Sequence, residues 1–330
     1  MNAKRVYWYL SIFLLILALV VIIFGAYVRL TDAGLGCPDW PGCYGKLLVP
    51  DESSLSVGDQ LVLDRPFEVG KAWREMIHRY MASVLGLGVL FLAGLAFFKR
   101  QELKIDTTAA YILLPLVIFQ GMLGMWTVTL LLKPLVVTAH LLGGITTLSF
   151  LYWNVLQYRF PHVSLAVDKN LRILVWVGAL TVFTQIFLGG WTSTNYAALA
   201  CRELPTCNGQ WFPSEQLREA FILWRGLGAN YEFGVLDTPA RMAIHMVHRI
   251  GAVVTTIVLL MLIWRSVRCV FYQIKRLGWI LLCALICQIS FGFINVLGGL
   301  PISIAVAHNG GGAILFLVVV TMLFFTRSVD

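Results

Sequence analysis

The chain has 330 residues, of which 59% are hydrophobic and only 13% are charged. Its mean hydropathy is +0.80. Soluble domains have about 45–50% apolar residues, so this composition predicts a membrane protein. The net charge of +8 comes from lysines and arginines scattered in short clusters between apolar runs, a distribution that argues against nucleic-acid binding.

Eight apolar stretches are long enough to cross a bilayer core about 30 Å thick. The first follows Lys4 and Arg5. It resembles a signal peptide, but its length and the lack of a small-residue cleavage site predict a retained helix. We therefore expect an all-α integral membrane protein with eight transmembrane helices. In chain order, the predicted helices are 8–28, 72–98, 108–131, 136–158, 172–191, 240–265, 277–297 and 303–326.

An even number of spans places both termini on the same side of the membrane. The segments on that side carry a clear excess of lysine and arginine, whereas the rest of the chain, mostly the loops near 29–71 and 192–239, is close to neutral. Positively charged loops face the cytoplasm. The pattern predicts a multi-pass protein of the cell inner (cytoplasmic) membrane with both termini cytoplasmic.

The chain also repeats itself at a spacing of about 164 to 170 residues. Each unit has four helices, so both units enter the membrane in the same direction, as in a parallel repeat. We expect two tandem four-helix bundles, formed by residues 1–165 (the first half) and 166–330 (the second half). The matched segments are Cys37 and Cys43 with Cys201 and Cys207, His78-Arg79 with His248-Arg249, Gln120 and Gly124 with Gln288 and Gly292, and Ala139-His140 with Ala307-His308.

Five of the six histidines lie within apolar stretches, where a polar side chain usually faces the bundle interior. The sixth, His162, follows Pro161 in a predicted cytoplasmic loop and needs no special role. Four of the five recur in the repeat, and helix rise places them at similar depth in the outer half of the membrane. These four are His78, His140, His248 and His308.

Two imidazoles at one depth on facing helices supply both axial ligands of a haem iron, and the bundle supplies an apolar cavity. Nearby glycines, from Gly143-Gly144 and 310–312, leave room either for the flat ring or for close helix packing. A single intramembrane histidine would be better explained by an interhelical hydrogen bond, but duplicated pairs favour haem. Zinc and copper are weaker interpretations because neither half offers further consistent ligands at that depth.

The two halves differ beside the first histidine of each pair. Glu75 lies three residues before His78, on the same helical face, and its counterpart in the second half is His245. A carboxylate there relays protons or stabilises developing positive charge, or else pairs with a neighbouring arginine. His248 is the better ligand candidate because it matches His78, although His245 leaves the register open.

The loops contain two cysteine pairs, Cys37–Cys43 and Cys201–Cys207, on the predicted outer side, where disulfides persist. A structural staple is the simpler interpretation, and exchange of electrons is the alternative. Four arginines near the outer helix ends are suited to haem propionates, or else they snorkel to the interface. They are Arg29, Arg79, Arg241 and Arg249.

Segment 25–43, GAYVRLTDAGLGCPDWPGC, together with EMIHR at 75–79, AH at 139–140, HR at 248–249 and AHNG at 307–310, resembles the haem A synthase family. The resemblance covers essentially the whole chain. It implies an enzyme that oxidises the C8 methyl of haem O to a formyl group by successive hydroxylation, giving haem A for terminal oxidases. It also implies haem O synthase as an upstream partner and an electron-transfer partner of unspecified identity.

The same resemblance assigns roles to the paired histidines. It implies that His248 and His308 hold a haem b cofactor, that His78 and His140 bind the substrate haem, and that Glu75 is the essential acid. Two alternatives remain at this point. A dihaem b-type electron-transfer cytochrome fits the histidine pairs alone, and a transporter fits the parallel repeat, although the broken helices and midplane polar groups of transporters are not evident.

Overall fold

The computed structural model describes residues 2–56, 58, 66–161, 163–213 and 215–327, so His162 lies outside the described residues. Eight of its helices are long and apolar enough to cross a membrane. The predicted all-α fold with eight transmembrane helices is confirmed. These helices are α1 (Ala3–Leu30), α3 (Val69–Phe98), α5 (Thr108–Thr129), α6 (Pro134–Arg159), α7 (Lys169–Thr194), α9 (Thr238–Val267), α10 (Tyr272–Leu297) and α11 (Ile302–Thr326).

Most helices extend a few residues beyond the apolar stretches that predicted them, and at α1 and α7 a polar residue caps the extended start. The Asn2 side chain accepts a hydrogen bond from the Lys4 backbone N–H at 3.0 Å, so α1 begins before its apolar run. Asp168 caps α7 in the same way through Leu171 N–H, also at 3.0 Å. Such caps satisfy backbone donors that the first turn leaves unpaired.

Among the described residues, three short helices were not predicted: η1 (Glu52–Ser54), α4 (Arg100–Leu103) and α8 (Leu217–Ala220). Each has only three or four residues, too few to show a helical period in the sequence.

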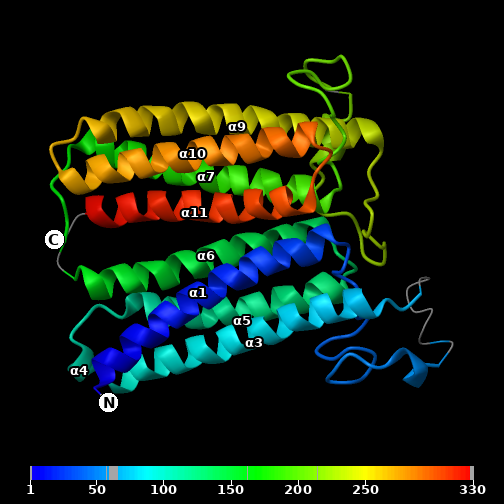
Figure 1. The fold of residues 1–330 in the computed structure, drawn as a ribbon, viewed down its shortest axis with the longest axis horizontal. Coiled ribbons are helices and arrows are strands. Elements are labelled where there is room, and N and C mark those ends of the chain that lie inside the picture. Colours follow the sequence, from blue (N-terminus) through cyan, green and yellow to red (C-terminus); the bar gives the residue numbers. More distant parts are fainter. Residues whose placement is uncertain (1, 57, 59–65, 162, 214, 328–330) are drawn as a thin grey trace.

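The eight long helices form two groups of four, one above the other in Figure 1. In the first group, α1 contacts α3, α3 contacts α5, α5 contacts α6 and α6 returns to α1. The second group repeats this ring with α7, α9, α10 and α11. Consequently α3 lies opposite α6, and α9 lies opposite α11, with the bundle interior between them.

The groups meet through α1, α6, α7 and α11, and several contacts there join a residue to its own repeat counterpart. Arg29 donates to the Ser193 carbonyl at 2.6 Å, and the Tyr196 hydroxyl donates to Asp32 at 3.2 Å, both across 164 residues. Contacts between equivalent residues are characteristic of a twofold axis. They support the division at residues 165 and 166, which stays a prediction.

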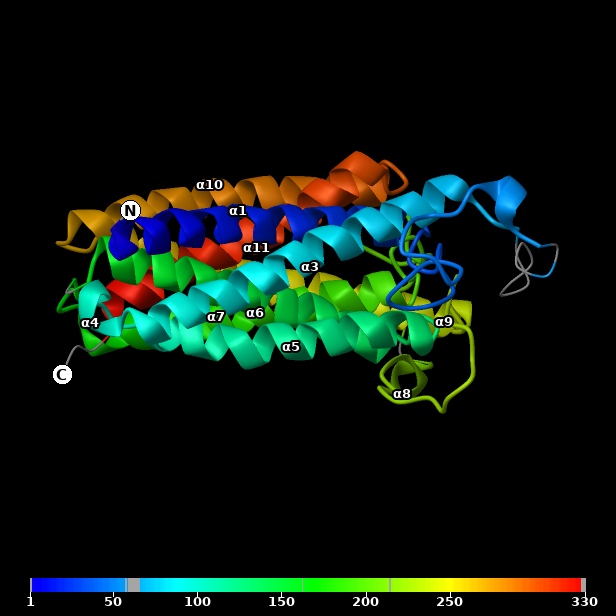
Figure 2. The ribbon, with the colours of Figure 1, turned by 90° about the horizontal axis from the view of Figure 1, so that it is seen from below.

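The long loops after α1 and after α7 lie at the same end of the helices, and the beginning of α1 and the end of α11 lie at the other end (Figures 1 and 2). We call the first of these the loop end. Buried side chains of both groups join in one extended hydrophobic core through the helices. The four paired histidines all lie toward the loop end.

Candidate functional site

Each half places its two histidines on opposite helices of the four-helix ring. His140 and His308 follow the first residue of α6 and of α11 by about 9 Å of helix rise. His78 and His248 lie about 14–15 Å from the first residues of α3 and α9. Within each pair the imidazoles are close enough to interact electrostatically, His78 with His140 and His248 with His308.

A glycine from a neighbouring helix faces the Cε1 edge of each of the four rings. A Cβ atom added at Gly25 would lie 2.8 Å from Cε1 of His78, and one added at Gly189 would lie 3.2 Å from Cε1 of His248. The corresponding distances are 3.5 Å from Gly124 to His140 and 3.4 Å from Gly292 to His308. Gly25 is the tightest of the four positions, since a contact below 3.0 Å forces the ring to shift.

The histidine rings also share a pattern of exposure. Nδ1 is buried in His78, His140 and His308, and in the described part of the chain it has no hydrogen-bond partner. The residues as a whole are nevertheless only half-buried. With Cε1 packed against glycine and Nδ1 enclosed, the accessible edge of each ring is the one that carries Nε2.

This donor set fits a haem better than a bare metal ion. Among the described residues there is no group of three or more His, Cys, Asp or Glu side chains arranged to hold a metal. A haem supplies four nitrogen ligands of its own and needs only two axial ones from the protein. Two accessible Nε2 edges from opposite helices, inside an apolar bundle, meet that need in each half.

Glu75 is buried beside the first pair, with a relative exposure of 4%. Its Oε1 forms an ion pair with Arg79 at 2.6 Å, and its Oε2 accepts the backbone N–H of Cys37 at 2.8 Å. The carboxylate is therefore fixed from two sides, by its own helix and by the disulfide loop above it.

His245 occupies the equivalent position in the second half and is also 4% exposed. Its Nδ1 is buried without a hydrogen-bond partner among the residues described. The ring faces the backbone carbonyl of Ala197 and interacts electrostatically with His248. The second pair thus has an imidazole where the first has a carboxylate.

The two predicted cysteine pairs are both disulfides in the structure, with S–S distances of 1.98 Å for Cys37–Cys43 and 1.95 Å for Cys201–Cys207. Each closes a short loop, and a tight turn with paired backbone hydrogen bonds follows its second cysteine, such as Cys43 N–H to Lys46 O at 2.8 Å. All four cysteines are buried. Each loop therefore packs against the start of the helix that carries the first histidine of its half.

Arg79 is occupied by this loop rather than extended toward the bundle interior. Its Nη1 donates to the backbone carbonyls of Asp39 at 2.9 Å and Gly42 at 2.6 Å, and its Nη2 donates to Glu75. The guanidinium therefore ties the loop, the helix and the acid together.

Arg249 does the same in the second half, with one difference. It donates to the carbonyls of Glu203 and Thr206 at 2.9 and 3.0 Å, the repeat counterparts of the Arg79 acceptors. Its Nη2 donates to the Cys201 carbonyl at 2.9 Å, because no carboxylate stands three residues before His248. The sequence placed both arginines near haem propionates, and the structure gives them loop carbonyls as partners.

Arg29 and Arg241 have other surroundings. Arg29 lies at the junction of the halves, 3.6 Å from Asp32 and with its guanidinium 4.1 Å from the ring centroid of Tyr196. The Nε of Arg241 is buried, and no hydrogen-bond partner for it exists within the described ranges.

The glycines near the fourth-helix histidines make room for neighbouring side chains. A Cβ at Gly143 would lie 1.7 Å from Nε2 of Gln120, and one at Gly311 would lie 2.5 Å from Oε1 of Gln288. Gly144 and Gly310 face α1. These contacts support close packing, and the role of the glycines toward a haem ring stays a prediction.

Sequence reasoning missed Gln185 on α7. Its Nε2 lies 3.0 Å from Nδ1 of His248 and donates to the His248 carbonyl at 3.0 Å. The signal was present in the repeat, since position 21, the counterpart of 185, holds valine.

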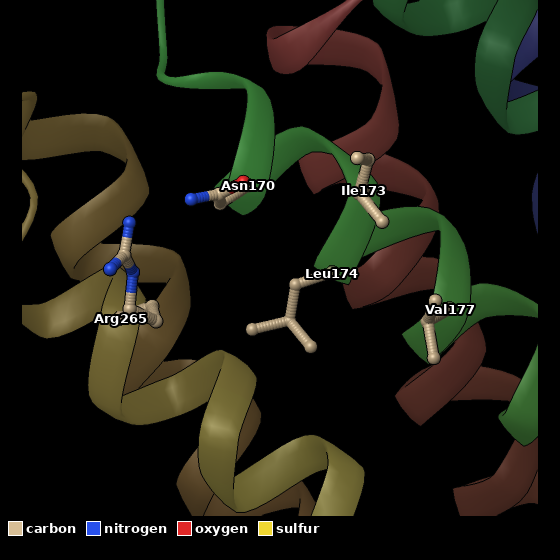
Figure 3. A pocket seen from close by; sticks show the side chains of 5 residues that line it. All are labelled: Asn170, Ile173, Leu174, Val177 and Arg265. Atoms are coloured by element: carbon tan, nitrogen blue, oxygen red, sulfur yellow. The ribbon is translucent and has the colours of Figure 1, made fainter.

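Two surface hollows lie away from the histidines. One, of about 310 Å³, lies between α7 and α9 at the end opposite the loops, where Arg265 faces Asn170, Ile173, Leu174 and Val177 (Figure 3). The other, of about 720 Å³, lies between α1 and α11 and is almost entirely apolar. Neither hollow is lined by a residue that the sequence predicts to bind haem.

Comparison with known proteins identifies the family. Residues 8–320 match the COX15-CtaA family, described as cytochrome oxidase assembly protein. The chain is 48% identical to a heme A synthase of Shewanella oneidensis over 96% of both chains. It is 26% identical to one of Caulobacter vibrioides over 97% of this chain and 95% of the relative. The chain belongs to the COX15-CtaA family of cytochrome oxidase assembly proteins.

Proposed function

We propose that this protein is a haem A synthase, which oxidises the C8 methyl of haem O to a formyl group by successive hydroxylation. The observation that carries the proposal is the asymmetry of two otherwise matched histidine pairs, since only the first has a buried, doubly held carboxylate, Glu75, beside it. The name of the 48% identical relative supports the same activity. The product, haem A, would serve terminal oxidases.

In this proposal the second half, 166–330, holds a haem b cofactor between His248 and His308. A bis-histidine haem supplies one-electron chemistry at its iron. The protein's part is to present two Nε2 atoms at fixed orientation and to exclude water through the apolar bundle. His245 lies one turn from His248 and supports the ligand helix rather than replacing the ligand.

The first half, 1–165, binds the substrate haem O through His78 and His140. Glu75 lies on the same helical face as His78 and acts on the macrocycle's edge, either by accepting a proton or by stabilising positive charge that develops during oxidation. Arg79 and the Cys37 N–H keep this carboxylate oriented. Arg29 and Arg241, and more distantly Arg79 and Arg249, supply positive charge for propionates at the loop end.

The reaction also needs other proteins. Haem O synthase supplies the substrate. An electron-transfer partner carries electrons to or from the protein during the oxidation. The excess of basic residues at the end opposite the loops favours a protein of the inner membrane with both termini in the cytoplasm and both disulfide loops outside.

Co-expression tests the proposal. Cells that make haem O synthase and this protein should contain haem with a formyl group, identified by chromatography and mass of the extracted haems. Cells with haem O synthase alone should contain haem O and no formyl haem. If haem O alone persists when both proteins are present in the membrane, the proposed activity is wrong.

A dihaem b-type electron-transfer cytochrome is the second candidate, because both halves offer a bis-histidine pair. It predicts two stably bound, reversibly reducible b haems per chain. The proposal above predicts one resident haem b and a second site that exchanges its haem.

A further inference from the structure

The hollow of about 310 Å³ between α7 and α9, at the end opposite the loops, differs in polarity along its length (Figure 3). The amide of Asn170 and the guanidinium of Arg265 line it near the helix ends. Leu174 and Val177 line it further along α7, toward the middle of the membrane. From Asn170 to Val177 the helix rises about 10 Å. The hollow therefore has a polar mouth and an apolar interior.

Helix packing explains where the hollow begins. α7 and α9 pack closely at Gly178, where an added Cβ atom would lie 3.1 Å from Cδ2 of Leu262. Nearer the helix ends the facing side chains leave the hollow open to the outside. Ile173 and Val177, which line it, are 49% and 41% exposed. Because both residues lie on a membrane-spanning helix, this apolar surface meets lipid chains rather than water.

The mouth of the hollow carries positive charge that is only partly neutralised. Arg265 donates to the Asp168 carboxylate at 3.0 Å, its one hydrogen-bond partner among the described residues. The two side chains are 39% and 54% exposed, so the pair is weak and leaves other N–H groups of the guanidinium available. Arg268 lies one turn beyond Arg265, with its guanidinium 4.5 Å from the ring centroid of Trp264. Two guanidinium groups thus stand near one carboxylate, which leaves an excess of positive charge.

Apolar residues occupy the equivalent positions of the first half. Asn170 has Val6 as its repeat counterpart, and Arg265 has Leu95. The four-helix ring is the same in both halves, so this ring does not require an amide and a guanidinium at these positions. Their presence in the second half alone indicates a role that is specific to this hollow.

We propose that this hollow binds one phospholipid with an anionic headgroup. Its phosphate pairs with Arg265 and accepts from the Asn170 amide, and its acyl chain lies along Ile173 and Val177. A planar guanidinium matches two phosphate oxygens, and basic pockets between transmembrane helices bind anionic headgroups. A free phosphate ion would leave the apolar part of the hollow empty. In the orientation proposed above the lipid belongs to the cytoplasmic leaflet, and its binding is independent of the haem chemistry.

The test uses the full-length protein in phosphatidylcholine vesicles that contain a trace of phosphatidylglycerol with a photoreactive group on its acyl chain. After illumination, mass spectrometry of peptides should find crosslinks on α7 near Ile173 and Val177. One basic residue near an anionic lipid corresponds to about a fivefold change in binding, so Arg265→Gln should reduce these crosslinks about fivefold. Lys99→Gln is the matched control and should leave them unchanged, because Lys99 forms a similarly exposed ion pair, with Glu102, at the same end of the first half.

Asp168→Asn separates lipid binding from the ion pair. Asparagine also caps helices, so this variant keeps the start of α7 while it removes the negative charge beside Arg265, and the crosslinks should not fall. Equal losses in Asp168→Asn and Arg265→Gln would reduce the hollow to an ion pair between helices and overturn the inference. Equal crosslinking by a phosphatidylcholine probe with the same chain also overturns it, as does displacement by inorganic phosphate as effective as by unlabelled phosphatidylglycerol. These outcomes leave the proposed function untouched, because none of them depends on haem.

Discussion

The first and second halves of the chain hold their histidines in the same frame but surround them with different chemistry. In both, the paired histidines lie on opposite helices, each ring rests against a glycine, and an arginine ties a disulfide loop to the helix start. Among the described residues, the first pair has the buried carboxylate of Glu75 beside it, and the second has the Gln185 amide 3.0 Å from Nδ1 of His248.

This difference suggests a general way to obtain an enzyme from a duplicated haem-binding unit. Both halves use the same arrangement of helix contacts, so one bundle geometry serves both sites. In the proposed function a few substitutions then separate the sites, with a buried carboxylate beside the first histidine pair and an imidazole in its place beside the second. The following predictions test this separation.

The largest expected effect comes from the second histidine pair. Replacing His308 or His248 with alanine removes an axial ligand from the resident haem, so purified protein should lose nearly all of its haem b absorbance. The same change at His78 or His140 should leave that absorbance intact and abolish formation of formyl haem. Haem b lost from His78→Ala but kept in His308→Ala would exchange the roles of the halves.

Glu75→Gln should lower product formation by about 10²–10⁴-fold, the usual contribution of a positioned acid or base. Haem b content should not change, because Glu75 lies on α3 of the first half and the proposed haem b ligands, His248 and His308, lie in the second half. Glu68→Gln is the matched control, since this half-exposed residue pairs with Lys71 on the same helix and carries the same charge. Equal activity of the two variants would remove Glu75 from the mechanism.

The two disulfide loops differ in one contact, because the first donates a backbone N–H to Glu75. Each bridge closes a short loop, so serine in place of either pair should destabilise its loop by about 2 kcal/mol. Breaking Cys37–Cys43 also frees the N–H that binds Glu75, and we expect about a tenfold loss of product formation, the rate equivalent of one such bond to a charged group.

The control is the double serine variant of Cys201 and Cys207, which destabilises the protein similarly without touching the acid. Thermal unfolding and product formation, measured on both variants, separate the two effects. If both variants lose activity alike, the loop acts through stability alone.

The smallest effect concerns pH at the second loop. Hydrogen bonds from Gly209 N–H and the Thr206 hydroxyl hold the pKa of the exposed Glu203 below its ordinary value of 4.5. A lowered folded-state pKa stabilises the loop above pH 4.5, and this contribution disappears as pH falls through the folded-state pKa. Hydrogen exchange of the loop should therefore speed up slightly on acidification, and Glu203→Gln should remove that dependence. If hydrogen exchange of the loop keeps the same pH dependence in Glu203→Gln, this role of Glu203 is contradicted.

Much of this architecture is readable from the sequence, because it depends on local composition and on spacing. Each transmembrane helix needs an apolar run of sufficient length, and the histidine pairs were visible through the repeat. Helix ends were less accurate, because caps such as Asn2 and Asp168 let charged residues enter the first turn.

Contacts that depend on chain folding were not predictable in this way. Arg79 and Arg249 were predicted as propionate contacts, and the sequence does not show that the loops fold back and present carbonyls to them. Gln185 was missed because its contact joins two different helices. Comparing each residue with its repeat counterpart, and asking where polar replaces apolar, would have found it.

The central claim is that the first half holds the substrate haem and the second half the cofactor, and the Glu75→Gln protein offers its most direct test. Purified from cells that make haem O synthase, this protein should contain one haem b and one farnesylated haem per chain. Adding His78→Ala should remove only the farnesylated haem, and adding His308→Ala should remove only haem b. Loss of haem b with His78→Ala, or two haems of one kind in the parent, would contradict the account.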